Sequence, residues 1–324
     1  MHGLAHVRGS AFDLGGAAAP HGKTALADEA HWVTSCVRAV HVACALLVVV
    51  DARAANAWID VAWERVRACR VVHHCMFEAL LATCAFAGWI ALYKLADRTP
   101  ALRHLRFRSA TEHVRQGVSY TNSWVMGAGY LALIYAFHQL RTKPPLDIAP
   151  PTARRLGVEV ALGVVAYDAC EFCAHVLMHR VRCLHRLHRT HHAQAALTAA
   201  ETLHHDTADA VQQVVLNVLV QQLSPWGAKH SLSRMVHNVL VTYMLTEIHA
   251  GYDAPWCMHR VWPALFGGAA RHEVHHRDGN VYYAEFFKGF DELLGSVKPR
   301  MASTGASLSG ESAGGVRRAV GQRT

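Results

Sequence analysis

Residues 156–192 read LGVEVALGVVAYDACEFCAHVLMHRVRCLHRLHRTHH, an apolar run that passes directly into a group of histidines. The apolar part is long enough for a helix that crosses a lipid bilayer, which needs about 20 residues. At its end, His175 and His179 are four positions apart, so they share one face of a helix and both imidazoles can reach one metal ion. The stretch therefore predicts a membrane helix that carries part of a metal site.

Two further histidine clusters repeat one spacing. They have the pattern H-x-x-H-H, first at His188, His191 and His192 and, about 80 residues later, at His272, His275 and His276. On a helix the three positions of such a motif share a face. A single pair of histidines with helical spacing also arises by chance, so the repetition is what makes the pattern specific. The three clusters together predict a metal centre.

The eight histidines of these clusters are more than one ion needs. A structural zinc takes four ligands, usually with thiolates, and a catalytic zinc takes three. Eight imidazoles therefore indicate two ions with room left for a substrate or O2, and imidazole suits iron, copper and zinc. Attack on an unactivated C–H bond needs an oxidant made from O2, and zinc cannot change its oxidation state. The carboxylate set of ferritin-like di-iron sites is not recognisable here, so we expect a nitrogen-rich centre.

The composition indicates a protein that is partly covered by lipid. Of the 324 residues, 52% are hydrophobic and only 17% are charged, whereas soluble domains have about 25% charged residues. The net charge of +8 lies in short basic clusters between apolar stretches. We interpret these clusters as loops against anionic lipid headgroups, and expect no nucleic-acid partner.

Apolar segments of helical length recur along the chain. Candidate membrane helices lie at 32–50, 75–95, 119–140 and 156–179, and shorter apolar segments lie at 211–223 and 236–248. The stretch 143–151 contains several prolines and is expected to be a loop. Strand patterns are nearly absent. The sequence predicts an all-α, multi-pass membrane helical bundle with a polar helical cap that holds the histidines.

Other function classes find little support in the sequence. There is no P-loop, no G-x-G-x-x-G after a strand and no G-x-S-x-G motif. The nine cysteines are scattered, and the C-x-x-C pair of Cys170 and Cys173 lies in an apolar helical pattern without a second pair. Four histidines outside the motifs are interpreted as surface or packing residues: His185, His230, His237 and His259.

The histidine motifs and their surroundings resemble the fatty acid hydroxylase/sterol desaturase superfamily, which carries H-x-x-x-H and two H-x-x-H-H motifs in this order. Asp168 stands seven residues before His175, as in that family. The stretch 249–295 is similar to the C-terminal block of C4-methylsterol oxidases. Three residues beside the motifs depart from the family pattern: Val176 replaces an arginine, Glu171 replaces an aromatic residue and Phe290 replaces a tryptophan.

The resemblance implies a membrane-bound enzyme with two non-haem iron ions, which uses O2 to hydroxylate or desaturate a sterol or fatty acyl lipid. It also implies electrons from cytochrome b5 or another reductase, and location in the endoplasmic reticulum. It adds His249 to the ligands, and His205, which we choose over His204. The expected metal ligands are His175, His179, His188, His191, His192, His205, His249, His272, His275 and His276.

Three carboxylates are expected to orient ligand rings from behind: Asp168, Asp209 and Asp253. The expected domains are a disordered segment at 1–28, membrane helices at 29–154, the di-iron domain at 155–297 and a disordered tail at 298–324. Two alternatives stay open. The chain could be a histidine-rich membrane protein that binds or transports zinc, or a catalytically inactive homologue of the oxygenases.

Overall fold

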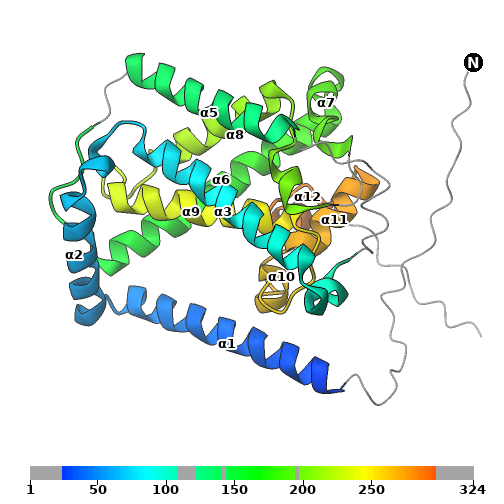
Figure 1. Ribbon diagram of the computed structural model, residues 1–324, viewed down its shortest axis with the longest axis horizontal. Helices are drawn as coiled ribbons and strands as arrows, with labels where there is room; N and C mark the ends of the chain where they lie inside the picture. Colours follow the sequence, from blue (N-terminus) through cyan, green and yellow to red (C-terminus); the bar gives the residue numbers. More distant parts are fainter. Residues whose placement is uncertain (1–23, 108–120, 141–143, 194–196, 297–324) are drawn as a thin grey trace, which may run out of the picture.

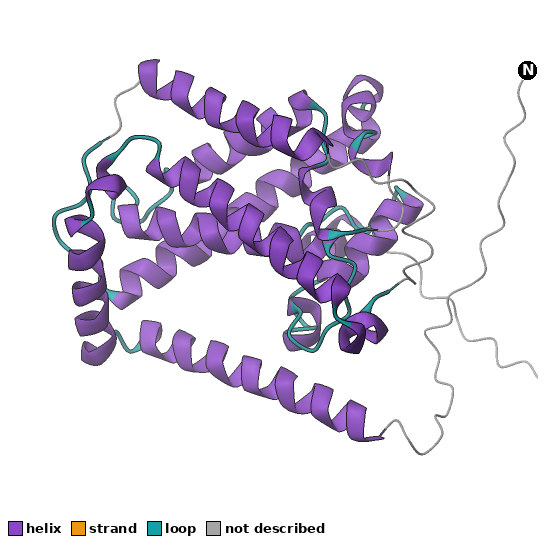
Figure 2. Ribbon diagram, in the orientation of Figure 1, coloured by secondary structure: helices purple, strands orange, loops and turns teal. Residues whose placement is uncertain are grey.

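The computed structural model of the protein describes residues 24–107, 121–140, 144–193 and 197–296. Within these ranges the chain forms helices and loops without a strand, as Figure 2 shows. Two isolated bridges, Arg106 with Tyr252 and Phe266 with Phe287, are the only extended pairings in the described part. The predicted all-α fold class is confirmed.

Five long helices run roughly side by side (Figure 1). They are α1 (Thr24–Val49), α3 (Phe77–Arg98), α5 (Thr121–Leu140), α6 (Ala153–Arg180) and α9 (Ser231–His249). By length and composition, α1 from His31 to Val49, α3 and α6 could each cross a membrane. These three helices match predicted spans, and α5 occupies the range predicted for the fourth.

Shorter elements complete the described chain. The helices are α2 (Arg53–Ala68), α7 (Arg182–His188), α8 (Thr207–Val220), α10 (Met258–Val261), α11 (Gly268–Asp278) and α12 (Lys288–Leu294). Single 3-10 turns are η1 (Arg70–His73), η2 (Pro100–Leu105), η3 (His191–Ala193) and η4 (Ala199–Leu203). Figure 1 shows α7, α10, α11 and α12 gathered at one end of the long helices, and this end forms the predicted cap.

The ends of the histidine-bearing helices follow local rules. The N-cap of α6 is Thr152, whose hydroxyl oxygen accepts a hydrogen bond from the backbone N–H of Arg155 at 3.1 Å. Helix α11 ends at Gly279, where a φ of 74° favours a residue without a side chain. The loop after Gly279 then returns along α6. Tyr167 of α6 and Phe286 of this loop share an apolar core with Met244 of α9.

The polar residues of the first predicted span have partners in the cap. Arg38 donates a hydrogen bond from Nε to the carbonyl oxygen of Val261 at 3.0 Å. His41 Nδ1 accepts one from the indole N–H of Trp262, also at 3.0 Å. The two residues that interrupt the apolar pattern of α1 therefore bind it to α10 and the loop after it.

The predicted terminal segments fall mostly outside the described residues. The tail at 298–324 lies outside them entirely, and so does 1–28, except that 24–28 belong to α1. The predicted loop is described from residue 144 and stays non-helical until α6 begins.

Candidate metal centre

Nine histidines that are far apart in the sequence meet in the cap and form two groups. The five-histidine group consists of His175, His179, His188, His192 and His275. The four-histidine group consists of His191, His249, His272 and His276. Within each group, one nitrogen of every ring lies within 4.8 Å of the nitrogens of the others. Rings of the two groups also touch, since His192 stacks on His276 with centroids 4.5 Å apart.

Both H-x-x-H-H motifs divide between the groups in the same way. The first and last histidines of a motif go to one group, and the middle one, His191 or His275, goes to the other. Helix α11 is continuous through its motif, whereas α7 ends at His188 and the other two histidines lie in η3. Each motif thus contributes histidines to both groups. The i, i+3, i+4 spacing places the three rings on one helix face, but it does not predict this division.

Most rings are held from behind through Nδ1. Five of them have Nδ1 within hydrogen-bond distance of an oxygen: His175 with Tyr283 O, His249 with Leu245 O and His275 with Val281 O at 2.7 Å, His188 with Asp209 Oδ2 at 2.9 Å, and His191 with His204 O at 3.3 Å. A carbonyl or carboxylate oxygen only accepts, so Nδ1 must carry the proton. In a neutral ring this leaves Nε2 with a free lone pair, as a metal ligand requires.

The Nε2 atoms of the five-histidine group crowd around one point. That of His192 lies 3.1 Å from those of His188 and His275, and 3.2 Å from that of His179. His192 can donate at most one proton, and the Nε2 atoms of His188 and His275 carry none in the neutral ring. Several lone pairs therefore face one another, an arrangement that a cation between them would stabilise.

The four-histidine group has the same spacing. His249 Nε2 lies 2.9 Å from that of His272 and 3.2 Å from that of His191, and His272 lies 3.1 Å from His276. Two nitrogens bound at right angles to one ion, with bonds of about 2.1 Å, are about 3.0 Å apart, whereas tetrahedral ligands are about 3.4 Å apart. The histidines present therefore fit two metal ions. The distances between their Nε2 atoms are closer to those of ligands at right angles than to those of tetrahedral ligands.

Burial favours the neutral form of five of these rings. It lowers the pKa of His249 and His275 to about 3. In His191, His272 and His276, burial and the neighbouring histidines hold the pKa well below its ordinary value. Neutral imidazole is the form that binds metal, so the described cap presents these rings ready for ions.

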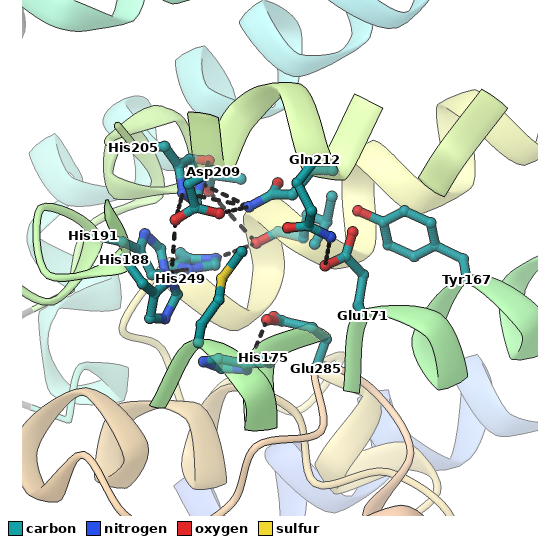
Figure 3. Close-up of a pocket in the computed structure, with 14 residues that line it drawn as sticks. Tyr167, Glu171, His175, His188, His191, His205, Asp209, Gln212, His249 and Glu285 are labelled. Carbon is teal, nitrogen blue, oxygen red and sulfur yellow. Dashed lines mark hydrogen bonds and ion pairs between the residues drawn. The ribbon is translucent and has the colours of Figure 1, made fainter. Parts of the chain in front are cut away.

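Asp209 of α8 stands behind the five-histidine group. Its Oδ2 lies 2.9 Å from Nδ1 of His188 and 3.2 Å from Nδ1 of His205, as Figure 3 shows. Burial would raise the pKa of this carboxyl, but the hydrogen bonds from the two histidines outweigh it, and the pKa is lowered. Asp209 is therefore a buried carboxylate that fixes the ring of His188.

His205 lies outside both groups, which differs from its predicted role as a ligand. Its ring stacks on His191 with centroids 4.3 Å apart. Nδ1 lies 3.2 Å from Asp209 Oδ2 and Nε2 lies 2.9 Å from the carbonyl oxygen of Thr202. Both partners only accept. Burial lowers the pKa of His205, but Asp209 raises it above its ordinary value. Both ring nitrogens are engaged, so neither is available to a metal.

The other two predicted carboxylates do not contact the nine rings in the described structure. Asp168 accepts hydrogen bonds from the backbone N–H groups of Phe286 at 2.9 Å and Phe287 at 2.8 Å, and so holds the loop after α11. Asp253 accepts from His259 at 2.9 Å and pairs with Arg260. Asp168 therefore acts on the ligands only through the loop that anchors His175 and His275.

Glu285 is a residue that the sequence reasoning missed. Its carboxyl group lies 3.5 Å from Nδ1 of His175, beside which Figure 3 shows it. It also lies 3.8 Å from Nδ1 of His272, so it stands between one ring of each group. One sequence feature could have indicated it: Glu285 is the single acidic residue in the apolar and aromatic stretch 281–287, VYYAEFF, and it stands nine residues after His276.

The histidines outside the motifs have structural contacts. His230 is buried, and its Nδ1 accepts from the backbone N–H of Leu232 at the start of α9. His237 is also buried, and His259 pairs with Asp253. His185 lies on the exposed face of α7, with its ring centroid 5.8 Å from that of His179. These positions agree with the interpretation as packing or surface residues.

Two cavities lie side by side next to the histidines. A small cavity of about 20 Å³, enough for one water molecule, is lined by His175 and His188 of one group and His191 and His249 of the other. A larger cavity of about 420 Å³ lies between α3, α5, α6, α8 and α9. The cavities share five lining residues: Tyr167, Thr202, His205, Gln213 and Leu245.

Comparison with known proteins gives a family and several relatives. Residues 160–296 match the fatty acid hydroxylase family model. Cholesterol 25-hydroxylase of Rattus norvegicus is 30% identical over 179 residues, which are 52% of this chain and 58% of the relative. Cholesterol 25-hydroxylase-like protein of Danio rerio is 31% identical over 45% of this chain and 58% of the relative. A second protein of Danio rerio, cholesterol 25-hydroxylase-like protein 2, is 27% identical over 68% of this chain and 82% of the relative. No solved structure matches the chain.

Proposed function

We propose, from the premise that this chain belongs to the fatty acid hydroxylase/sterol desaturase superfamily, that it is a membrane-bound di-iron oxygenase that hydroxylates a lipid. The superfamily is the one that the sequence predicted, whereas the finer likeness to C4-methylsterol oxidases stays a prediction. In the reaction, a C–H bond, O2, two electrons and two protons give a C–OH group and water. The observation that carries the proposal is the convergence of nine imidazoles in two adjoining groups.

Each histidine group would hold one ion. When bound, two iron ions would supply the redox chemistry that turns O2 into an oxidant able to attack a C–H bond. The protein's part is to hold the rings in place, through Asp209 behind His188 and through the backbone carbonyls behind His175, His249 and His275. Nitrogen ligands without a carboxylate among them would leave the ions strongly electrophilic.

The large cavity would hold the lipid. Its wall is mainly apolar, its volume of about 420 Å³ is in the range of small-molecule sites, and it adjoins the small cavity beside the histidines. A lipid in this cavity would exclude water and place one carbon near the centre. The relatives named cholesterol 25-hydroxylase favour a sterol over a fatty acyl substrate. The same cavity would also admit a desaturation, because both reactions begin with hydrogen abstraction.

An electron donor protein, such as cytochrome b5 or a reductase, would bind at the cap. Helix α7 carries exposed arginines next to the five-histidine group, two of whose rings are partly exposed. The exposed arginines in and beside α7 are Arg180, Arg182, Arg186 and Arg189. Such a basic surface suits an acidic partner. We propose the endoplasmic reticulum as the membrane.

The test uses the full chain purified from membranes. We expect about two irons per chain, O2 uptake on reduction, and a new hydroxylated lipid in a host that expresses the chain. The control is His185→Ala, which lies outside both groups. Bound zinc without a response to reductant would support the zinc-binding alternative, and two irons with no lipid product would support an inactive homologue.

A further inference from the structure

The large cavity has a polar end inside its mainly apolar wall. Asn217 of α8 and Asn238 of α9 line it there. The side-chain N–H of Asn217 donates to Asn238 Oδ1 at 3.1 Å, and that of Gln221 donates to the same oxygen at 2.8 Å. Both acceptor positions of Asn238 Oδ1 are thus filled. Its Nδ2 makes no hydrogen bond with the described residues and remains as a donor for the cavity.

The orientation of these amides is set from behind by a histidine and a lysine. His237 Nε2 lies 3.2 Å from Asn217 Oδ1, an acceptor, so Nε2 carries the proton and Nδ1 has the lone pair. A Cβ on Gly163 would lie 2.4 Å from Lys229 Nζ and 2.6 Å from His237 Nδ1, so both nitrogens lie beside this glycine, and neither has a hydrogen-bond partner among the described residues. The positive charge of Lys229 favours a lone pair over a proton on the near side of the ring, which agrees with the directions given for the amides of Asn217 and Asn238.

The distance from this donor to the histidines follows from the helices. Asn217 stands eight residues after Asp209 on α8, and Asn238 stands 11 residues before His249 on α9. At 1.5 Å per residue, the polar end lies about 12 to 16 Å along these helices from the histidine groups.

We infer that Asn238 Nδ2 binds the oxygen of a neutral lipid, such as a sterol alcohol, and thereby sets which carbon meets the centre. That carbon would lie about 12 to 16 Å from the bound oxygen. The inference rests on the proposed function. A neutral amide donor suits a hydroxyl or ketone oxygen better than a carboxylate, which would require a cation. Lys94 also lines the cavity, but near the C-terminal end of α3, beside η4 and close to the centre.

The first test uses only the wild-type chain in detergent and three labelled probes: cholesterol, the 3-ketone cholest-4-en-3-one, and cholestane, which lacks the oxygen. We expect cholesterol to bind about three- to tenfold more tightly than cholestane, the range of one hydrogen bond. The ketone should bind within about threefold of cholesterol, because the protein supplies the proton. Equal binding of cholesterol and cholestane would overturn the inference, as would tighter binding of a long-chain fatty acid that is lost in Lys94→Met.

The second test uses Asn238→Leu, which removes the donor and keeps the branching and the number of non-hydrogen atoms of the side chain. We expect cholesterol to bind about three- to tenfold more weakly and cholestane to bind as before. Thr242→Val is the matched control, because this cavity hydroxyl already donates to the carbonyl oxygen of Val239 at 2.9 Å. A preference for cholesterol that persists in Asn238→Leu would contradict the inference.

Iron content and O2 uptake are measured on the same preparations. Two irons without a preference for the oxygen-bearing probes would overturn only the inference. A preference without iron would overturn the proposed oxygenase and leave the binding role of Asn238 supported. If Asn238→Leu does not fold, the binding of the three probes to the wild-type chain still tests the inference.

Discussion

The two histidine groups are made from the same motifs but differ in burial and support. All four rings of the four-histidine group are buried, whereas His179 and His192 of the five-histidine group are partly exposed. The five-histidine group has a buried carboxylate behind one ring, at Asp209, while His191 and His249 of the other group have only backbone carbonyls. We infer that the five-histidine group is the more open to solvent and would exchange its ion more readily.

The largest effect expected is from removing one ligand of each group in turn. His275→Ala takes one nitrogen from the five-histidine group, and His276→Ala takes one from the other. Each should lower hydroxylation more than 100-fold and the iron content from about two to about one per chain, since a remaining ion alone would not complete the centre. Lipid analysis and metal analysis of purified protein measure this. If either variant keeps its turnover, the two groups do not form one centre.

The next largest effect is expected from Asp209, the carboxylate behind the five-histidine group. Asp209→Asn should weaken the binding of one ion about 10- to 100-fold, which is typical of residues behind a metal ligand. Iron remaining after dialysis against a chelator measures it. Asp206→Asn is the matched control on α8, because Asp206 caps this helix and asparagine caps equally well. Retention of both ions as in the wild-type chain would contradict the role of Asp209 behind His188.

Acid should destabilise both groups in the metal-free protein. The pKa of His249 and of His275 is about 3 in the folded chain, below the ordinary value of about 6.5. Between these values the unfolded chain binds more protons, so stability falls as pH falls. At pH 5 each histidine would lower the free energy of unfolding by about 2 kcal/mol relative to its value at pH 7. Thermal unfolding at the two pH values measures this, and a stability that is unchanged would exclude these shifts.

The smallest effect expected is from Glu285, which stands beside one ring of each group. Burial raises the pKa of Glu285 well above its ordinary value, but two cations beside it would favour the charged form. Glu285→Gln keeps the shape and prevents this charge from forming near His175 and His272, so both ions should bind about three- to tenfold more weakly. Glu292→Gln, an exposed carboxylate of α12, is the control. Weakening of one ion alone would show that Glu285 does not serve both groups.

Sequence spacing predicted eight of the nine rings that meet, and the family resemblance added His249, but neither could divide the rings between two groups. His188, His191 and His192 have the periodicity of a helix face, and only the end of α7 and the turn of η3 decide which ring goes where. His205 was chosen by family likeness, and no local pattern could show that Thr202 and Asp209 engage both of its nitrogens.

The contacts of the residues that depart from the family pattern could also not be predicted from the sequence. Phe290, which replaces a tryptophan, stacks on Phe172 with ring centroids 5.6 Å apart. Glu171, which replaces an aromatic residue, lines the small cavity and accepts a hydrogen bond from Gln212 at 3.2 Å. Both contacts join segments far apart in the chain, so no local pattern in the sequence predicts them.

The division of each H-x-x-H-H motif between two centres has a thermodynamic consequence. An ion in either group fixes the backbone of η3 and α11, and the same backbone presents ligands to the other group. The conformational entropy lost when the first ion binds would not be lost again for the second, so the two affinities would be coupled and filling would be cooperative. A titration of the metal-free protein would then be sigmoidal, and half-loaded chains would be rare.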